Sequence, residues 1–272
     1  MNQKKNFARR TFKLYKYIEQ TVIPKFRKVE YEDKKNIYDF SLKLMDVEYP
    51  YSCTFEEGLI MLDTILRNQL KSGYEIATAF GISSLFIGSG FKVTRGHLQS
   101  IDCYIEESKN DFIYSEKEIA EHILKIRKEV SSGILPSGLK IAQSNADELK
   151  ISKNISYIIG VSPQDVITSV NDNLDFVFID GGHFGDQPLL DFEAVKSKIR
   201  TEKCALFFHD NNGNPATAKA IKSAEDFFGI KSIDLNTHWH LTVLPIGIEI
   251  VNVVNNKVKK SLLKNLFSYL FR

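Results

Sequence analysis

Short apolar runs alternate with helical patterns from residue 54 to about residue 251. The run "FVFI" at 176–179 carries β-branched and aromatic residues in succession, which is typical of a central parallel strand covered on both faces. Two of the helical patterns between the runs open with an N-cap residue followed by proline, at Ser162-Pro163 and at Asn214-Pro215. The second of these helices is expected to end at Gly229. The expected strands are 74–78, 98–102, 156–160, 175–180, 204–209, 231–235 and 241–251.

Strands and helices that alternate at this spacing predict an α/β fold with a doubly wound, seven-stranded and mostly parallel sheet. The last two predicted strands are joined only by "NTHWH", which leaves no room for a helix. The last strand is therefore expected to run antiparallel to its neighbour.

Helical spacing also predicts segments outside the sheet. Residues 1–53 are expected to form a helical N-terminal extension, and the central domain spans 54–256. This domain begins with an amphipathic helix in which Thr54 and Glu57 are placed as a capping box, and Gly73 is expected to close it. The connection after Asp102 is long enough for a helical insertion at 105–153, which we expect to act as a lid or a dimer surface.

The composition is that of an ordinary globular protein, with 43% hydrophobic and 26% charged residues among 272. The 36 basic and 34 acidic side chains nearly cancel, which argues against a nucleic-acid partner. Cys53, Cys103 and Cys204 have no metal-site spacing and are expected to stay reduced in the cytoplasm. No apolar signal core is visible, and no apolar run approaches the ~18 residues of a membrane span.

Basic residues concentrate at the two ends of the chain, and the middle is acidic. Residues 257–272, "KVKKSLLKNLFSYLFR", hold five Lys/Arg and no acid, with Leu262, Leu266 and Leu270 on one helical face. One interpretation is a helix that docks on the N-terminal helices or on a second subunit of a homo-oligomer. The other is weak attachment to an anionic membrane surface, which would make a cytoplasmic protein peripheral at the inner membrane face.

Two polar residues follow the buried run at 176–179, in the sequence "FIDGGH". Asp180 and His183 thus lie at the carboxyl end of a parallel strand, which is where ligands bind in open α/β sheets.

The end of the first strand is also suited to a ligand. The small residues Ala77, Thr78, Ala79 and Gly81 would let a ligand approach the backbone and the N-terminus of the next helix. Asp102 follows Gly81 by 21 residues, at the end of the second strand, where an acid can accept both hydroxyls of a ribose. The pair indicates a cofactor that contains a nucleoside.

With these segments in this order, residues 74–251 resemble the class I S-adenosylmethionine-dependent methyltransferases, and within them the small-molecule O-methyltransferases of the catechol and caffeoyl-CoA type. The resemblance implies a Rossmann-like methyltransferase fold. It also implies S-adenosylmethionine as the cofactor. "EIATAFGIS" is similar to the segment that holds the methionine end, "SIDCY" to the ribose segment and "GVSPQ" to the adenine loop. The residues that this assigns to the cofactor are Glu75, Ala77, Thr78, Gly81, Ser83, Asp102, Ser162, Gln164 and Asp180.

The resemblance further implies a divalent metal, with Asp180, Asp210 and Asn211 as ligands in "FIDGGH" and "FFHDNN". Two carboxylates and one amide oxygen suit Mg²⁺ or a similar ion. His183 stands where the family often has a lysine base, and histidine can take a proton near neutral pH. An "IDGxH" pattern also occurs in related bacterial branches of these methyltransferases. The catalytic residues are therefore expected to be His183 and Asp180.

Other interpretations stay open at this point. Ala77 stands where the family usually has glycine, which adds a methyl group beside the cofactor and also fits a non-catalytic binding protein. Asp180 and Asp210 can act as helix caps, and His183 and His209 can be packing residues. The acids and histidines of the two segments could instead surround the metals of a metallohydrolase: Asp180, His183, Asp186, His209, Asp210 and Asn211. As acceptor we expect a hydroxylated small molecule or a sugar of a glycan.

Overall fold

The computed structural model describes residues 53–104, 124, 128, 131–132, 137–183, 185–237 and 239–250. The predicted N-terminal extension, most of the insertion at 105–153 and the C-terminal basic helix lie outside the described residues, so these interpretations stay predictions. Within the described part, no helix is long and apolar enough to cross a membrane.

Seven strands form one sheet, in the order β3-β2-β1-β4-β5-β7-β6. Strand β7 pairs antiparallel with both β5 and β6, and the other pairs are parallel, as the sequence pattern predicted. The bounds are β1 (Ser72–Ile76), β2 (His97–Asp102), β3 (Ile155–Ile159), β4 (Phe176–Ile179), β5 (Cys204–Phe208), β6 (Ile233–Asp234) and β7 (Thr242–Ile246).

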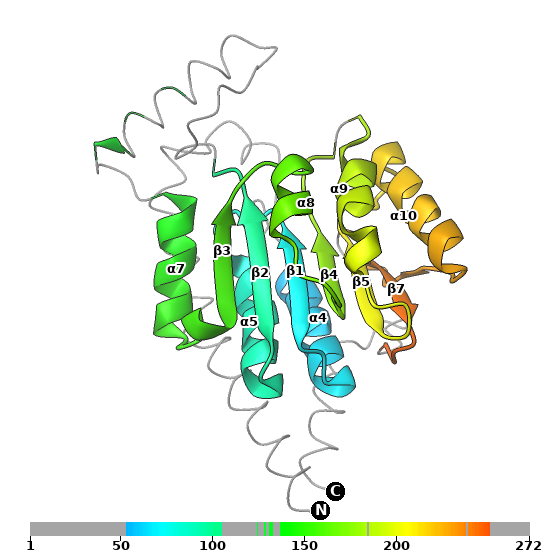
Figure 1. Cartoon of the computed structure of the whole chain (residues 1–272), viewed down its shortest axis with the longest axis horizontal. Coiled ribbons are helices and arrows are strands. Elements are labelled where there is room, and N and C mark those ends of the chain that lie inside the picture. The colour runs from blue at the N-terminus through cyan, green and yellow to red at the C-terminus, as the bar shows by residue number, and fades with distance from the viewer. Residues whose placement is uncertain are drawn as a thin grey trace, which may run out of the picture.

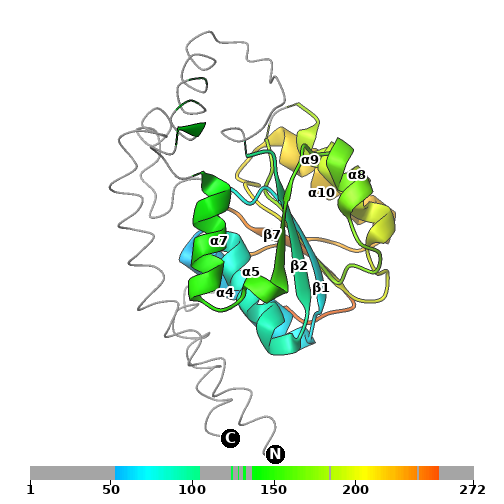
Figure 2. The same ribbon diagram turned by 60° about the vertical axis from the view of Figure 1, so that its left-hand side comes forward.

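Helices cover both faces of the sheet in two layers (Figures 1 and 2). One layer holds α4 (Phe55–Asn68), α5 (Ile82–Thr94) and α7 (Gly138–Glu148), and the other holds α8 (Gln164–Ser169), α9 (Gln187–Val195) and α10 (Pro215–Phe228). Short 3-10 turns lie at Ser152–Asn154 and Lys196–Lys198. Each layer has its own apolar core against the sheet, and successive residues of β4 alternate between the two cores: Phe176 and Phe178 in one, Val177 and Ile179 in the other.

The predicted caps have mixed outcomes. The capping box of Thr54 and Glu57 at the start of α4 is confirmed, as are the Asn214 cap of α10 and its end at Gly229. The predicted end of α4 at Gly73 is wrong, because Gln69 takes the left-handed conformation at φ 52° and ends the helix there. Gly73 lies instead in β1, where a Cβ atom would come 2.4 Å from the ring of Phe91.

The predicted N-cap at Ser162 is also wrong. Helix α8 begins at Gln164 without a side-chain cap, and the Ser162-Pro163 peptide bond is cis. The Ser162 hydroxyl donates to the carboxylate of Asp191 in α9 instead, so it is not available to the amides of α8.

Helix α7 lies within the predicted insertion and forms part of the helical layer beside α5 (Figure 2). Its Ala142 packs on the turn after β1, where a Cβ on Gly81 would come 2.7 Å from the Ala142 Cβ. The C-terminal part of that segment therefore supports the turn after β1.

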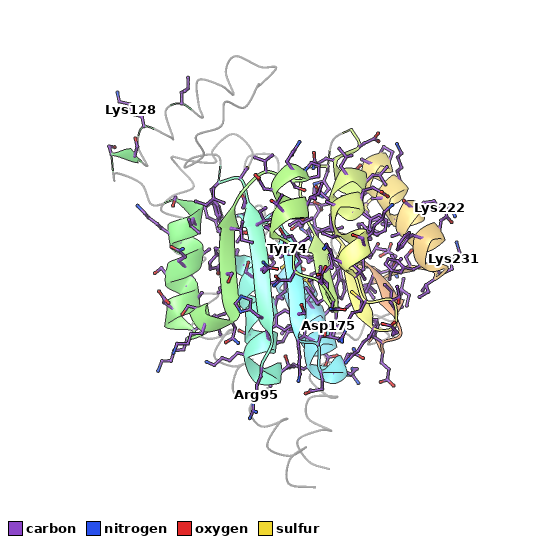
Figure 3. The ribbon with its side chains drawn as sticks, viewed as in Figure 1. Tyr74, Arg95, Lys128, Asp175, Lys222 and Lys231 are labelled. Carbon is purple, nitrogen blue, oxygen red and sulfur yellow. The ribbon has the colours of Figure 1, made fainter. Side chains whose placement is uncertain are left out.

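Asp175, which directly precedes β4, connects the amino-terminal ends of β4 and β1 (Figure 3). Its carboxylate accepts from the backbone amides of Lys71 and Ser72 at 2.8 to 3.0 Å. Lys222 and Lys231 lie at the outer side of the α10 region, away from the sheet (Figure 3). Asp175, Lys222 and Lys231 therefore lie away from the carboxyl ends of the strands, where the predicted site residues are found.

Candidate active site

Four neighbouring strands end at the same edge of the sheet and bring the predicted site residues together. The amide of Ala77 donates to Ile101 O at 2.9 Å, and the amide of Asp180 donates to Ile76 O at 3.1 Å. The amide of His209 in turn donates to Ile179 O at 3.1 Å. The residues that follow β2, β1, β4 and β5 are thus aligned side by side.

The turn between β1 and α5 is sharply curved. Ala77 has φ 75°, Ala79 has φ 46° and Gly81 has φ 81°, which are left-handed conformations that favour glycine. The amide of Gly81 donates to Thr78 O at 2.7 Å and closes the turn. This conformation explains why glycine is the easier residue at position 77, since alanine is strained there.

A buried polar cluster supports this turn from below. Glu75 is fully buried and accepts hydrogen bonds from the hydroxyls of Ser83, Ser84 and Ser100, with Ser83 and Ser100 at 2.5 Å. Burial raises the pKa of Glu75 to about 7, although the three serine hydroxyls act in the opposite direction. Thr78 is buried as well and lies 2.6 Å from the Ser100 hydroxyl. The side chains of Glu75, Thr78 and Ser83 therefore shape the turn, and the turn's backbone is what it offers to a ligand.

Asp102 ends β2 beside the turn and is half-buried. Its Oδ2 accepts from the amide of Ala79 at 2.8 Å, and its Oδ1 accepts from the amide of Tyr104 at 2.8 Å. Each carboxylate oxygen has a further lone pair, so Asp102 can hold the turn and still accept from a ligand hydroxyl.

The two residues of the predicted adenine loop differ in their surroundings. Ser162 donates to Asp191, and Gln187 donates to Ser162 O at 3.2 Å and to Asp191 Oδ1 at 2.7 Å. Gln164 is exposed at the start of α8. The Ser162 hydroxyl is thus occupied within the protein, whereas Gln164 is open to a ligand.

Asp180 and Asp210 meet at the ends of β4 and β5, with His209 between them. His209 Nδ1 lies 2.9 Å from Asp180 Oδ1 and 3.4 Å from Asp210 Oδ2. One atom from each of the three side chains lies within 4.8 Å of the others, which fits a single metal ion. Asp210 is held in the left-handed conformation at φ 55°.

His209 is buried, as predicted, but it is more than a packing residue. Its Nε2 lies 3.2 Å from Glu57 Oε2 of α4, and the imidazole is 4% exposed. Burial lowers the pKa of His209, but the charge of Asp180 and the close approach of the Asp180, Asp210 and Glu57 carboxylates raise it well above 6.5. The protein's own charges thus favour a positive charge at this point.

Glu57 is the site residue that the sequence pattern did not reveal as such. Its side chain accepts from the Thr54 amide at 2.7 Å, the Thr237 hydroxyl at 2.6 Å and the Trp239 amide at 3.3 Å, besides its contact with His209. Burial raises the pKa of Glu57, but the hydrogen bond and charge of His209, together with the hydrogen bonds from Thr237 and Thr54, outweigh burial and lower this pKa to about 2. Its place in a capping box was its only signal in the sequence.

The predicted base and the predicted amide ligand lie next to this cluster. His183 Nε2 is 3.3 Å from Asp210 Oδ2, and both side chains are about a quarter exposed, at 27% and 28%. Asn211 donates through Nδ2 to the Thr242 hydroxyl of β7 at 3.0 Å, which leaves its Oδ1 as the group for a cation.

An open hollow of about 710 Å³ adjoins His183. Its lining mixes polar and apolar surface and comes from the turn after β4 and the start of α10: His183, Gly185, Asp186, Asn212, Gly213, Asn214, Pro215, Ala216 and Lys219. Lys219 Nζ and Asp186 Oδ1 pair across it at 2.8 Å. A hydroxylated molecule could lie there within reach of His183.

Comparison with known proteins gives consistent results. Residues 74–211, just over half of the chain, match the model of a family described as a methyltransferase domain. The O-methyltransferase TomG from Streptomyces achromogenes, involved in tomaymycin synthesis and solved in complex with SAM, is 14% identical, with a TM-score of 0.51 over 84% of this chain and 91% of that one. A putative caffeoyl-CoA O-methyltransferase from Staphylococcus aureus is also 14% identical, with a TM-score of 0.51 over 88% of this chain and 99% of that one.

No curated protein matches the sequence of this chain at a significant level. The two solved structures are similar to this chain in fold, and the match to the family model runs from Tyr74 in β1 to Asn211, which includes the turn, Asp102, Asp180 and Asp210. The chain therefore belongs to the methyltransferase-domain family, and its sheet has the class I fold of the S-adenosylmethionine-dependent methyltransferases.

Proposed function

We propose that the protein transfers the methyl group of S-adenosylmethionine to a hydroxyl of a small molecule or a sugar, with the help of a divalent metal. The observation that carries the proposal is the convergence of Asp180, Asp210 and His183 beside the turn after β1. An acceptor oxygen held by these groups would lie next to a cofactor bound on the turn.

The cofactor is held by the edge formed by β1 and β2. The curved backbone from Ala77 to Gly81 receives the methionine end, since small side chains leave the backbone amides accessible. Asp102 accepts the ribose hydroxyls with the lone pairs that the Ala79 and Tyr104 amides leave available. Gln164, exposed at the start of α8, contacts the adenine.

The acidic pair and Asn211 form the metal site of the proposal. Asp180 and Asp210 already lie close enough to share one ion, and the amide of Asn211 is oriented by Thr242. When bound, a divalent metal would lower the pKa of the acceptor hydroxyl. The contribution of the protein is then the alignment of that hydroxyl with the methyl group, on which the rate of such a transfer depends.

His183 serves as the proton acceptor. Its Nε2 lies 3.3 Å from Asp210 Oδ2, so a carboxylate is in place to stabilise the imidazolium that forms. The hollow beside it supplies the acceptor site, and its two asparagines, one aspartate and one lysine offer hydrogen bonds to hydroxyl groups.

Calorimetric titration with S-adenosylmethionine tests this proposal directly. We expect binding at one site per chain, and transfer of a radiolabelled methyl group to at least one member of a panel of catechols and free sugars. A metallohydrolase would not bind the cofactor, so no heat of binding would refute the proposal. Binding without transfer to any acceptor or to a cell extract would favour a non-catalytic binding protein.

A further inference from the structure

The imidazole of His209 has the position of a metal ligand. His209 follows β5 directly, and its Nδ1 lies 2.9 Å from Asp180 Oδ1 and 3.4 Å from Asp210 Oδ2. Two neighbouring ligands of a transition metal with bonds of about 2.1 Å lie about 3 Å apart. Nδ1 therefore lies from both carboxylates at about the spacing of ligands that share one ion, and all three atoms are within 4.8 Å of one another.

Nδ1 of His209 is not satisfied by the protein. It is buried and makes no aligned hydrogen bond within the described residues, even though Asp180 Oδ1 is only 2.9 Å away. Nδ1 is thus close to both carboxylates, but neither carboxylate oxygen lies in the direction in which the ring nitrogen carries its proton or lone pair. A cation shared with the two carboxylates would satisfy this nitrogen, whereas a simple ion pair leaves it poorly bonded.

The other ring nitrogen is held by Glu57. Nε2 lies 3.2 Å from Glu57 Oε2, and Glu57 is itself fixed by Thr54, Thr237 and the Trp239 amide. A histidine that binds a metal usually donates its second N–H to a carboxylate, which fixes the ring orientation and places the lone pair on the ligating nitrogen. Glu57 occupies this position relative to His209.

We propose that His209 binds the metal through Nδ1, together with Asp180 and Asp210, and that Glu57 is its positioning residue. This inference deepens the proposed metal-assisted function and rests on it, since that proposal takes oxygen ligands alone. A nitrogen ligand changes the metal, because Mg²⁺ prefers all-oxygen sites while imidazole suits Mn²⁺, Fe²⁺, Co²⁺ and Zn²⁺. The site is therefore one for a transition metal.

Pulsed electron paramagnetic resonance of the full-length protein loaded with Mn²⁺ tests the ligand without any mutation. We expect a nitrogen coupling from one imidazole, and its pattern should change when the protein is grown with ¹⁵N-histidine. Mn²⁺ bound without a histidine nitrogen coupling would overturn the inference, as would no binding of Mn²⁺, Co²⁺ or Zn²⁺ to metal-free protein in calorimetry. In those cases His209 is a charged partner of Glu57 and Asp180, and no ligand.

Variants identify which histidine is responsible. His209→Gln should abolish the coupling, whereas His183→Gln and the control His97→Gln, at the opposite end of the sheet beside Ser156, should keep it. Loss of the coupling in His183→Gln alone would overturn the inference. Glu57→Gln tests the positioning role, with an expected 10-fold to 100-fold loss of Zn²⁺ affinity. His209→Gln and Glu57→Gln both remove a buried ion pair and can fail to fold. In that case the ¹⁵N-histidine measurement on the unmutated protein, with His183→Gln and His97→Gln, decides the ligand.

Metal preference is the third measurement. Mn²⁺ or Zn²⁺ should bind at least tenfold more tightly than Mg²⁺ in calorimetry, and an equal or better affinity for Mg²⁺ would argue for oxygen ligands alone. Titration with S-adenosylmethionine separates this inference from the proposed function. A protein that binds the cofactor and a divalent metal but gives no histidine nitrogen coupling would refute the inference only, while one that binds metal through His209 but no cofactor would refute the function.

Discussion

Glu57 and His209 form an ion pair between the first helix of the described chain and the end of β5, 152 residues apart in the sequence. Neither side chain is more than 4% exposed. The pair connects α4, which precedes the sheet, with the group of acids at the carboxyl ends of β4 and β5. A substitution or movement in α4 is thus expected to alter the position of His209 in the site.

Removal of this charge pair should lower stability in a manner that depends on pH. The pKa of Glu57 is lowered from 4.5 to about 2, so its ionised form stabilises the folded state above pH 4.5, and this stabilisation is lost as the pH falls from 4.5 to 2. The shift corresponds to about 3 kcal/mol. In metal-free protein, Glu57→Gln should be less stable than the wild type at pH 4.5, and this difference in the free energy of unfolding should shrink by about 3 kcal/mol as the pH falls to 2. His209 is protonated over the whole of this pH range, so its own titration does not contribute.

Urea unfolding at several pH values measures this difference. Glu193→Gln, at an exposed position of α9, is the matched control and should change stability by less than about 0.5 kcal/mol. A deficit of Glu57→Gln that stays constant from pH 5 to pH 2 would show that its carboxylate is not paired as described.

Glu75 should give the opposite dependence. Burial raises its pKa from 4.5 to about 7, so its stabilising contribution is complete below pH 4.5 and is lost as the pH rises through 7. Relative to Glu75→Gln, which cannot ionise, the wild type should lose about 3 kcal/mol between pH 4.5 and pH 8. Thermal unfolding of both proteins across this range checks the sign. A wild type that gains stability over the range relative to the variant would contradict the buried, protonated state.

Much of the sheet could be predicted from local patterns. Runs such as 176–179 and 204–208 are continuously apolar because both faces are covered, and the short link before β7 allowed only an antiparallel strand. The role of Gly73 was harder to predict, because a glycine after a helix can be a cap or can make room for a neighbour. Here the ring of Phe91 occupies the space of its side chain, and this contact comes from a helix that lies later in the sequence.

Site prediction had a similar limit. Asp102, Asp180 and Asp210 are each at the end of a strand, a position that local sequence reveals. The Glu57–His209 pair depends on how α4 packs against the end of β5, and the Ser162–Asp191 bond depends on how α8 lies beside α9. Such contacts between distant segments have no local pattern, so His209 was interpreted as a packing residue and Ser162 as a cap.

Ala77→Gly should not destabilise the protein. Ala77 has φ 75°, and a left-handed conformation costs a non-glycine residue about 1–2 kcal/mol. Glycine removes that strain but adds freedom to the unfolded chain, worth about 0.4–1 kcal/mol. We expect the free energy of unfolding to rise by zero to about 1.6 kcal/mol, and S-adenosylmethionine to bind several times more tightly because a methyl group leaves the turn.

Ala218→Gly in the exposed face of α10 provides the comparison for Ala77→Gly. In a helix interior the same substitution should lower stability by about 1 kcal/mol. If both variants lose equal stability in urea, Ala77 is not in a left-handed conformation. Weaker cofactor binding by Ala77→Gly would show that its methyl group contacts the ligand favourably.

Asp102→Ala should weaken the binding of S-adenosylmethionine at least tenfold, about 1.4 kcal/mol, because the ribose hydroxyls lose their acceptor. The carboxylate also holds the amides of Ala79 and Tyr104, so part of the loss can come from a loosened turn. Separate calorimetric titrations with adenosine and with methionine distinguish the two effects.

Loss of ribose contacts lowers the affinity for adenosine alone, whereas a loosened turn lowers the affinity for methionine as well. Asp172→Ala, on an exposed loop where Asp172 pairs with Lys198, should leave both affinities unchanged. If Asp102→Ala binds adenosine as tightly as the wild type, Asp102 is not a ligand of the ribose.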